Sequence, residues 1–135
     1  MKKFLSKKLK SEKGFTLVEL LAVIIILGIL AAIAIPVIAN LIGDSRQDAH
    51  DSNAQQMIEA ARLAQAQGKD QTEYTLEYLI TNKYLSAPSN PDEGGADYGR
   101  KNSKVTFKDG QWKAEIFVGD STTATGTAGS KEGSE

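Results

Sequence analysis

A single carboxylate stands in a long apolar stretch near the start of the chain. Glu19 is the only charged residue between Phe15 and Gly43, and the 24 residues from Leu20 to Gly43 carry no charge. An ionised carboxylate in such a segment is costly and normally implies a partner of opposite charge. The most evident chemistry in this sequence is therefore charge pairing by Glu19.

Other kinds of chemistry lack the residues that they need. The 135 residues include one histidine and no cysteine, which excludes thiol nucleophiles, disulfide scaffolds and iron–sulfur sites. The segment from Gly43 to Gln47 fails the nucleophile-elbow pattern at its last position, and the chain has no Walker-type phosphate loop. We therefore expect neither an enzyme nor a cofactor, and we expect His50 to be an exposed helix residue.

The charges are divided unevenly along the chain. Residues 1 to 14 hold six lysines and one glutamate, a net charge of +5, and the remaining 121 residues carry −6. A lysine-rich flank before an apolar run that can cross a bilayer core of about 30 Å is typical of a membrane-targeting segment whose basic end stays in the cytoplasm. A removable signal peptide cut before Asn40 is an alternative, which Glu19 and the length of the run disfavour.

A helix is predicted to continue beyond Pro36 as an amphipathic element. Its apolar residues recur at helical spacing, and Gly68 is a plausible stop. They are Ala54, Met57, Ile58, Ala61 and Ala64. A helix from Phe15 to Gln67 would be about 80 Å long at ~1.5 Å per residue, too long for a head of this size to bury.

The second half of the chain predicts a short helix and a hairpin. Leu76 to Asn82 forms the helix, with Thr75 as its N-cap. Asp109-Gly110 predicts a two-residue turn that places Phe107 opposite Trp112 and Val105 opposite Ala114, and that apolar face should pack on the helix around Met57 and Ala61. The further pairs expected are Ser103 with Ile116, Lys108 with Gln111, Thr106 with Lys113, and Lys104 with Glu115.

These elements predict an α+β fold in four parts. They are a basic segment (residues 1–14), an apolar helix long enough to cross a membrane (15–40), a head with a small antiparallel sheet (41–118) and a flexible tail (119–135). The tail prediction rests on its Gly, Ser and Thr content, because it has no large apolar residue to bury.

The residues around Gly14 resemble the class III signal of type IV pilins and pseudopilins. Lysines precede Gly14-Phe15-Thr16-Leu17-Val18-Glu19, and the uncharged run follows it. The resemblance implies that a membrane-embedded prepilin peptidase cuts between Gly14 and Phe15, that the new amino group of Phe15 is methylated, and that the apolar segment stays on the mature protein. Residues 1–14 would then be a cleaved leader, and the apolar helix (15–40) would form a filament core.

This resemblance also implies a partner for Glu19. Cleavage would create a positive α-amino group at Phe15, and a neighbouring subunit displaced along a filament could bring that amine to Glu19. The alternative is that Glu19 sits at the lipid headgroup boundary. Between Gly28 and Pro36 the helix is weakest, since glycine costs about 1 kcal/mol and proline about 3 kcal/mol in a helix interior. Family members often unwind between a matching glycine and proline, although a simple kink is the alternative.

The implied partners are other copies of the chain in a helical polymer, the prepilin peptidase, the membrane before assembly, and an assembly ATPase acting through a platform membrane protein. The implied location is the cytoplasmic membrane with the N-terminus inside, and then an extracellular filament. The missing cysteines depart from pilins that close a disulfide loop, and the head looks more like major pilins or competence pseudopilins of Gram-positive bacteria.

Two further sites are weaker predictions. A local excess of basic residues could contact DNA along a filament; these are Arg100, Lys101, Lys104, Lys108 and Lys113. The alternative is that three of these lysines form the solvent face of the hairpin while Phe107 and Trp112 point into the core.

Asp92, Glu93 and Asp97 could supply calcium ligands, although their spacing matches no recognised calcium loop.

The filament could serve motility and adhesion, DNA uptake or protein secretion, and the sequence does not choose among them. A monomeric signal-anchored protein with an outer binding domain explains the topology but leaves the Gly14, Phe15 and Glu19 arrangement unexplained. A pseudopilin of type II secretion is the other alternative.

Overall fold

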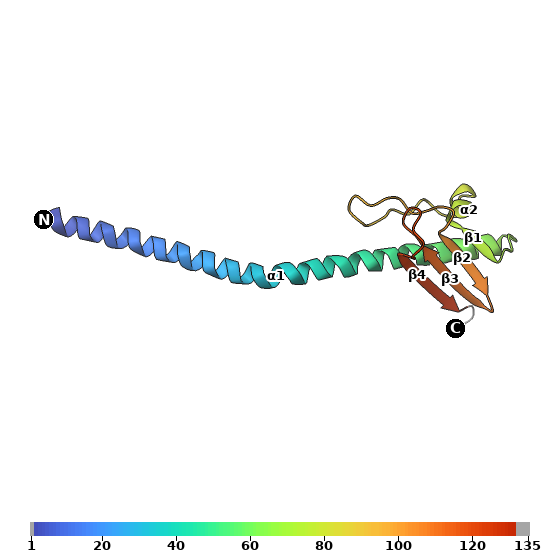
Figure 1. The fold of residues 1–135 in the computed structure, drawn as a ribbon, viewed down its shortest axis with the longest axis horizontal. Helices are drawn as coiled ribbons and strands as arrows, with labels where there is room; N and C mark the ends of the chain where they lie inside the picture. Colours follow the sequence, from blue (N-terminus) through green and yellow to red (C-terminus); the bar gives the residue numbers. More distant parts are fainter. Residues whose placement is uncertain (1, 132–135) are drawn as a thin grey trace. The chain divides into compact units, whose positions relative to one another are not determined.

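A computed structural model gives the fold of residues 2–131, with side chains described for residues 14–129. The chain divides into two compact units, residues 1–42 and 43–135. The elements are one long helix, α1 (Lys2–Ala66), a short helix, α2 (Leu76–Thr81), and four strands (Figure 1). The α+β fold predicted from the sequence is confirmed.

The described residues of the first unit, 2–42, are all helical. From Phe15 to Ile42 its large apolar side chains are 47% to 71% exposed, so the helix buries none of them within this unit. Pro36 lies inside the helix, which also runs without interruption through residues 29–35. The unwinding predicted for this stretch concerns a packed filament and remains a prediction.

In the second unit, α1 buries one face. The five residues predicted for that face, from Ala54 to Ala64, are fully buried. The helix ends at Ala66, and Gly68 follows with a φ of +79°, a conformation that glycine adopts without strain. The amphipathic half of the helix therefore forms as its periodicity predicts.

Helix α2 also follows the prediction closely. The Thr75 side chain accepts a hydrogen bond from the Tyr78 amide at 3.2 Å, which caps the first turn. Leu76 and Leu79 are buried against the core, and Ile80 is partly buried beside them. The helix ends one residue before Asn82, the end that the sequence predicts.

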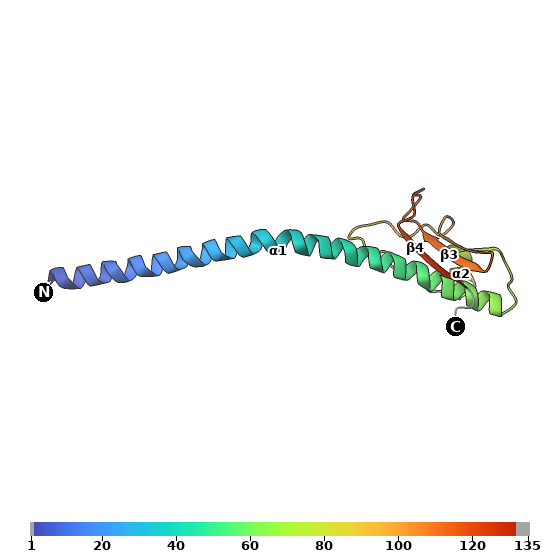
Figure 2. The same ribbon diagram turned by 90° about the horizontal axis from the view of Figure 1, so that it is seen from below.

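The four strands make one antiparallel sheet in the order β1-β2-β3-β4 (Figure 1), and Figure 2 shows β3 and β4 side by side. They are β1 (Glu73–Thr75), β2 (Lys104–Lys108), β3 (Gln111–Ile116) and β4 (Gly126–Lys131). The register of β2 and β3 is the predicted one from Lys104 with Glu115 to Lys108 with Gln111. Asp109 and Gly110 both have positive φ, as the tight turn between these strands requires.

Two features of the sheet differ from expectation. Ser103 lies outside β2, and its Oγ accepts a hydrogen bond from the Phe117 amide at 2.9 Å instead of facing Ile116 in a ladder. The flexible tail predicted over residues 119–135 is wrong for residues 126–131, which form β4 beside β3. The small side chains of β4 have little apolar surface to bury, but backbone pairing with β3 needs no large side chain. Residues 132–135 lie outside the described part.

Candidate functional site

The predicted cleavage and pairing residues lie in α1, where the described side chains begin. Gly14, Phe15 and Glu19 are all helical and exposed. Within the described side chains, Glu19 has no ion pair.

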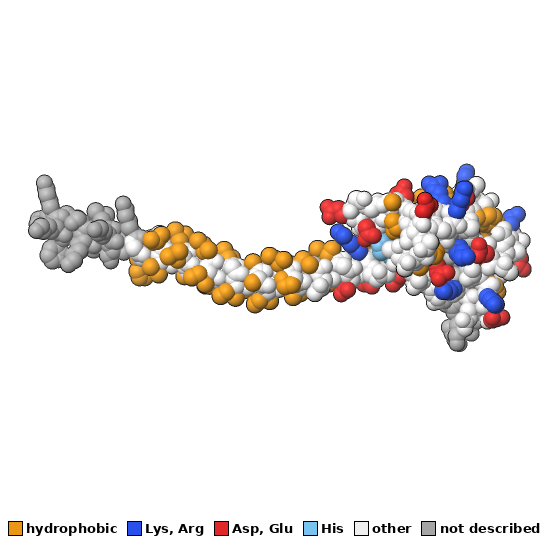
Figure 3. All heavy atoms as spheres, in the orientation of Figure 1, with side chains coloured by type: hydrophobic (Ala, Val, Ile, Leu, Met, Phe, Trp, Pro, Cys, Tyr) orange, Lys and Arg blue, Asp and Glu red, His pale blue; other side chains and the backbone are white. Residues whose placement is uncertain are grey.

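Past Glu19, exposed apolar side chains occupy nearly every position of the helix as far as Ile42, so they point in all directions around its axis, and Figure 3 shows them on the face in view. Among the described residues, one helix is long and apolar enough to cross a membrane, and its apolar window is not covered by other parts of the chain. A helix that is apolar on every side needs lipid or other apolar helices around it. From Leu20 to Ile42 the helix is therefore a surface for contact with lipid or with other helices.

In the head, His50 contradicts the prediction that it is exposed. Its side chain is 3% exposed and bonds at both ring nitrogens. Nδ1 lies 2.7 Å from the Tyr98 hydroxyl and Nε2 lies 3.2 Å from Asp92 Oδ2. Asn53 Nδ2 donates to the same hydroxyl at 2.9 Å. Every ring nitrogen has a partner if Tyr98 donates to Nδ1 and Nε2–H donates to Asp92.

This network fixes the long loop between α2 and β2 onto α1. Asn53 also donates to the Ser89 carbonyl at 3.0 Å, and the ring of His50 meets that of Tyr98 edge to face. Burial raises the pKa of Tyr98 above its ordinary value, the hydrogen bond from Asn53 lowers it, and the charge of Asp92 raises it. The partners are more than 35 positions apart in sequence, so no local pattern could have revealed the network.

The acidic residues of that loop do not converge as a calcium site would require. Asp92 bonds to His50, and Glu93 lies 3.6 Å from Arg46. The Asp97 backbone carbonyl accepts from the Gly119 amide. Among the described residues, no three acidic or histidine side chains are placed to share a metal ion.

The five basic residues predicted to contact DNA fall into two groups, three lysines on the hairpin and a pair, Arg100 and Lys101, in the loop before β2. Lys104 pairs with Glu73 and Lys113 with Glu115, each at 3.0 Å, on the solvent face of the sheet. Lys108 is exposed at the hairpin turn. Trp112 is 2% exposed and faces the core with Phe107, 4.5 Å away between ring centroids. DNA contact remains a prediction.

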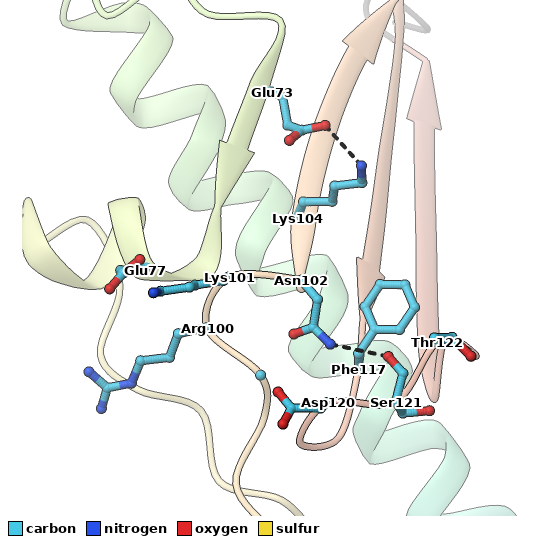
Figure 4. Close-up of a pocket in the computed structure, with 11 residues that line it drawn as sticks. Glu73, Glu77, Arg100, Lys101, Asn102, Lys104, Phe117, Asp120, Ser121 and Thr122 are labelled. Carbon is cyan, nitrogen blue, oxygen red and sulfur yellow. Dashed lines mark hydrogen bonds and ion pairs between the residues drawn. The ribbon is translucent and has the colours of Figure 1, made fainter.

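Arg100 and Lys101 lie in a groove of about 760 Å³ (Figure 4). The loop before β2, the first residue of β2 and the segment after β3 form most of its walls, and Phe117 contributes an aromatic surface. Glu77 and Asp120 also line the groove, so its two carboxylates balance the two cations. The other two charged residues of the lining, Glu73 and Lys104, pair with each other. The groove is mixed in charge and lacks a strong positive potential.

Comparison with known proteins gives a consistent result. Residues 9–35 match the family model described as the prokaryotic N-terminal methylation motif. The type IV major fimbrial protein FimA of Dichelobacter nodosus is 34% identical over 116 residues, which cover 84% of this chain and 70% of that protein. The fimbrial protein of Pseudomonas aeruginosa is 32% identical over 117 residues, 87% of this chain and 66% of that protein.

A relative from a secretion system is also similar. The type II secretion system core protein G of Vibrio cholerae is 31% identical over 94 residues, 66% of this chain and 62% of that protein. No solved structure matches the chain. The likeness to fimbrial proteins extends well beyond the N-terminal motif, because it spans most of the head.

Proposed function

The chain belongs to the type IV pilin family, and from this premise we propose that it is cut between Gly14 and Phe15 and then polymerised from the membrane through Glu19. It is a structural filament subunit: it polymerises with copies of itself, is processed by a prepilin peptidase, is anchored in the membrane and reaches the cell surface in a pilus. The family consists of structural proteins and not of enzymes.

The cleavage site is supported by position and by chemistry. Gly14 and Phe15 lie within the stretch that matches the methylation motif. Glycine presents no side chain for a protease to accommodate, and the lysines before it would hold the bond at the cytoplasmic face. Phe15 would then carry the new amino group and its methyl group, and residues 1–14 would be the leader.

The proposed role of Glu19 is to pair with the Phe15 amine of a neighbouring subunit. Glu19 and Phe15 lie on the same helix, within the first turns after the proposed cut, so an ion pair between them inside one chain is unfavourable. A neighbour displaced along the filament brings the two charges together in an apolar surrounding where each would be costly alone. The coincidence of Gly14, Phe15 and Glu19 at the start of the exposed apolar stretch of α1 is the observation that carries the proposal.

Assembly exchanges lipid for neighbouring helices. Both environments are apolar, so packing and charge pairing, rather than dehydration, supply the preference for the filament. Extraction from the bilayer then needs external work, which we assign to a cytoplasmic ATPase acting through a platform membrane protein. Head-to-tail contacts that do not close give an open fibre.

The role of the filament is proposed at the level of the relatives. Similarity to major fimbrial proteins favours a pilus serving motility and adhesion or DNA uptake. Similarity to the secretion core protein G supports a type II secretion pseudopilin as the second candidate. Deletion of the chain separates them: loss of surface filaments with normal protein export supports the pilus, and blocked export with no change in surface filaments supports the pseudopilin.

The processing proposal is tested by the intact mass and N-terminal sequence of protein sheared from the cell surface. We expect the chain to begin at Phe15 with one added methyl group. A start at Asn40 would indicate an ordinary secreted protein, and an uncut form starting at Met1 and confined to membranes would indicate an anchored monomer. Either result contradicts the proposal.

A further inference from the structure

The C-terminal strand β4 is attached to the head almost entirely through its backbone. It pairs with β3 from Gln111 with Lys131 to Ile116 with Gly126. Of its described side chains, only Ala128 packs partly against the core, while Thr127 and Gly129 are exposed. Apolar burial, the main contribution in the rest of the sheet, therefore contributes little to holding this strand.

Helix α1 fastens the beginning of β4 with two side chains. The Thr127 amide donates to Asp51 Oδ1 at 2.9 Å, and Gln47 Nε2 donates to the Thr125 carbonyl at 2.9 Å. Gln47 also bonds to Asp51 at 3.2 Å, which aligns the two side chains one turn apart on α1. We name Gln47 and Asp51 the clasp.

The clasp occupies an edge that would otherwise be open. The Thr127 amide points to Asp51 and therefore away from β3, and β4 is the last strand of the sheet. Exposed edges are templates for pairing with other chains unless charges, prolines or covering elements block them. From Thr125 to Gly129 the chain has neither a charge nor a proline, so the clasp and the contacting turn of α1 are what cover this edge.

Close approach of the backbones makes this contact specific. A Cβ on Gly126 would lie 2.6 Å from the His50 carbonyl oxygen, so the strand can rest on α1 there only with glycine. The contact depends on a few polar groups and one glycine. It can therefore be opened without disturbing the buried residues of the core.

We propose that β4 is an exchangeable strand and that the clasp keeps it in its own subunit. When the clasp opens, β4 leaves and exposes the edge of β3. The segment that best complements this edge is the β4 of a second copy, since its register with β3 is already built into the sequence. Exchange of an identical element between copies is a low-cost route to association, and filament assembly holds copies close together.

Mixed filaments test this exchange because the chain contains no cysteine. Glu115 on β3 and Thr127 on β4 are Cα partners. The Thr127 amide bonds to Asp51, so this pair has the close spacing of a non-hydrogen-bonded antiparallel pair, which suits a disulfide. One subunit carries Glu115→Cys and the other Thr127→Cys, both in full-length chains, and sheared filaments are run on a non-reducing gel.

We expect covalent dimers when both subunits also carry Gln47→Ala and Asp51→Ala, at about tenfold the yield found with the clasp intact. Asp51→Asn keeps an acceptor oxygen at this position, and we expect it to return the yield of covalent dimers to the level found with the clasp intact. Asp48→Ala is the matched control, because Asp48 is exposed on the same helix and makes no polar contact among the described residues.

Two controls keep the result decisive. A single chain with both Glu115→Cys and Thr127→Cys should close its disulfide internally, and if it does so while the mixed clasp variants give no dimers, the exchange is refuted. Thr106→Cys in place of Glu115→Cys puts the thiol on β2, which has no β4 partner. Equal dimer yields with Thr106→Cys, or with the clasp intact, would mean that filament packing and not strand exchange joins the subunits.

Discussion

The two units of this chain treat their apolar residues in opposite ways. From Phe15 to Ile42 the helix exposes all its large apolar side chains, whereas the head buries a continuous core in which Trp112, Tyr74 and Met57 are at most 2% exposed. Polar groups are divided in the same sense. Glu19 has no ion pair among the described side chains, while buried His50 is bonded at both ring nitrogens.

This difference predicts which property a substitution in each unit should change. The head satisfies its own apolar and polar groups, so substitutions there should change the stability of one subunit. The apolar helix leaves its groups to be satisfied by lipid or by other copies, so substitutions there should change assembly without altering the head. Substitutions placed in each unit test this difference.

Loss of the Glu19 carboxylate should have the largest effect. We expect Glu19→Ala to leave cleavage and membrane insertion intact but to reduce incorporation into filaments by about tenfold or more, since each ~1.4 kcal/mol of lost subunit affinity is a factor of ten. Quantification of sheared and membrane-bound subunits measures this. Asp44→Ala, beyond the apolar run, is the control, and wild-type assembly by Glu19→Ala would remove the pairing proposal.

The head core comes next in magnitude. Trp112→Ala deletes the largest fully buried side chain, which contacts Phe107 and lies beneath Arg62. We expect a loss of about 3 to 5 kcal/mol in the free energy of unfolding of the head. Circular dichroism of the full chain in detergent during denaturant titration measures it. Leu27→Ala, in the exposed helix, should leave the head transition unchanged, and an equal shift would deny that the units are independent.

The polar network around His50 should contribute less than the core. Tyr98→Phe removes the hydroxyl that Asn53 and His50 share, leaving buried polar groups short of a partner, and we expect a loss of about 1 to 3 kcal/mol. Asp48→Ala, on the same helix and exposed, should cost almost nothing. Equal stabilities of Tyr98→Phe and Asp48→Ala would show that the network does not hold the loop.

The same variant has a pH signature. The pKa of Tyr98 is raised by burial, so the folded head holds this proton more tightly than the unfolded chain does. Its contribution is fully present below the unfolded pKa of about 10 and is lost as the pH rises through the folded pKa. The stability difference between wild type and Tyr98→Phe should therefore shrink above about pH 10, and a constant difference across that range would contradict the assignment.

Local patterns predicted those parts of the molecule that local forces decide. The helix face from Ala54 to Ala64, the Thr75 cap and the Asp109-Gly110 hairpin follow from spacing and turn chemistry within a few residues. The edge strands β1 and β4 did not, because backbone pairing with a distant strand selects them. His50 was misjudged for a similar reason: its neighbours in sequence are polar, and the tyrosine and aspartate that enclose it come from a loop more than 40 positions away. The motif from Gly14 to Glu19 could be recognised because it is a pattern of consecutive residues, within the stretch that matches the methylation motif.

Removal of the hairpin lysines should have the smallest effect on the head. Lys104 and Lys113 pair with carboxylates at the surface, and exposed pairs contribute at most about 1 kcal/mol, so Lys104→Ala and Lys113→Ala should barely change the free energy of unfolding. DNA affinity distinguishes Lys108 from these two, because Glu73 and Glu115 already offset the charges of Lys104 and Lys113. If filaments bind DNA through this face, Lys108→Ala should reduce the slope of log affinity against log salt by about 0.9, the value for one phosphate contact. Lys104→Ala and Lys113→Ala should each reduce this slope by less than Lys108→Ala does. An unchanged slope after removal of all three lysines would reject DNA contact by the hairpin and leave its lysines as the solvated face of a self-contained head.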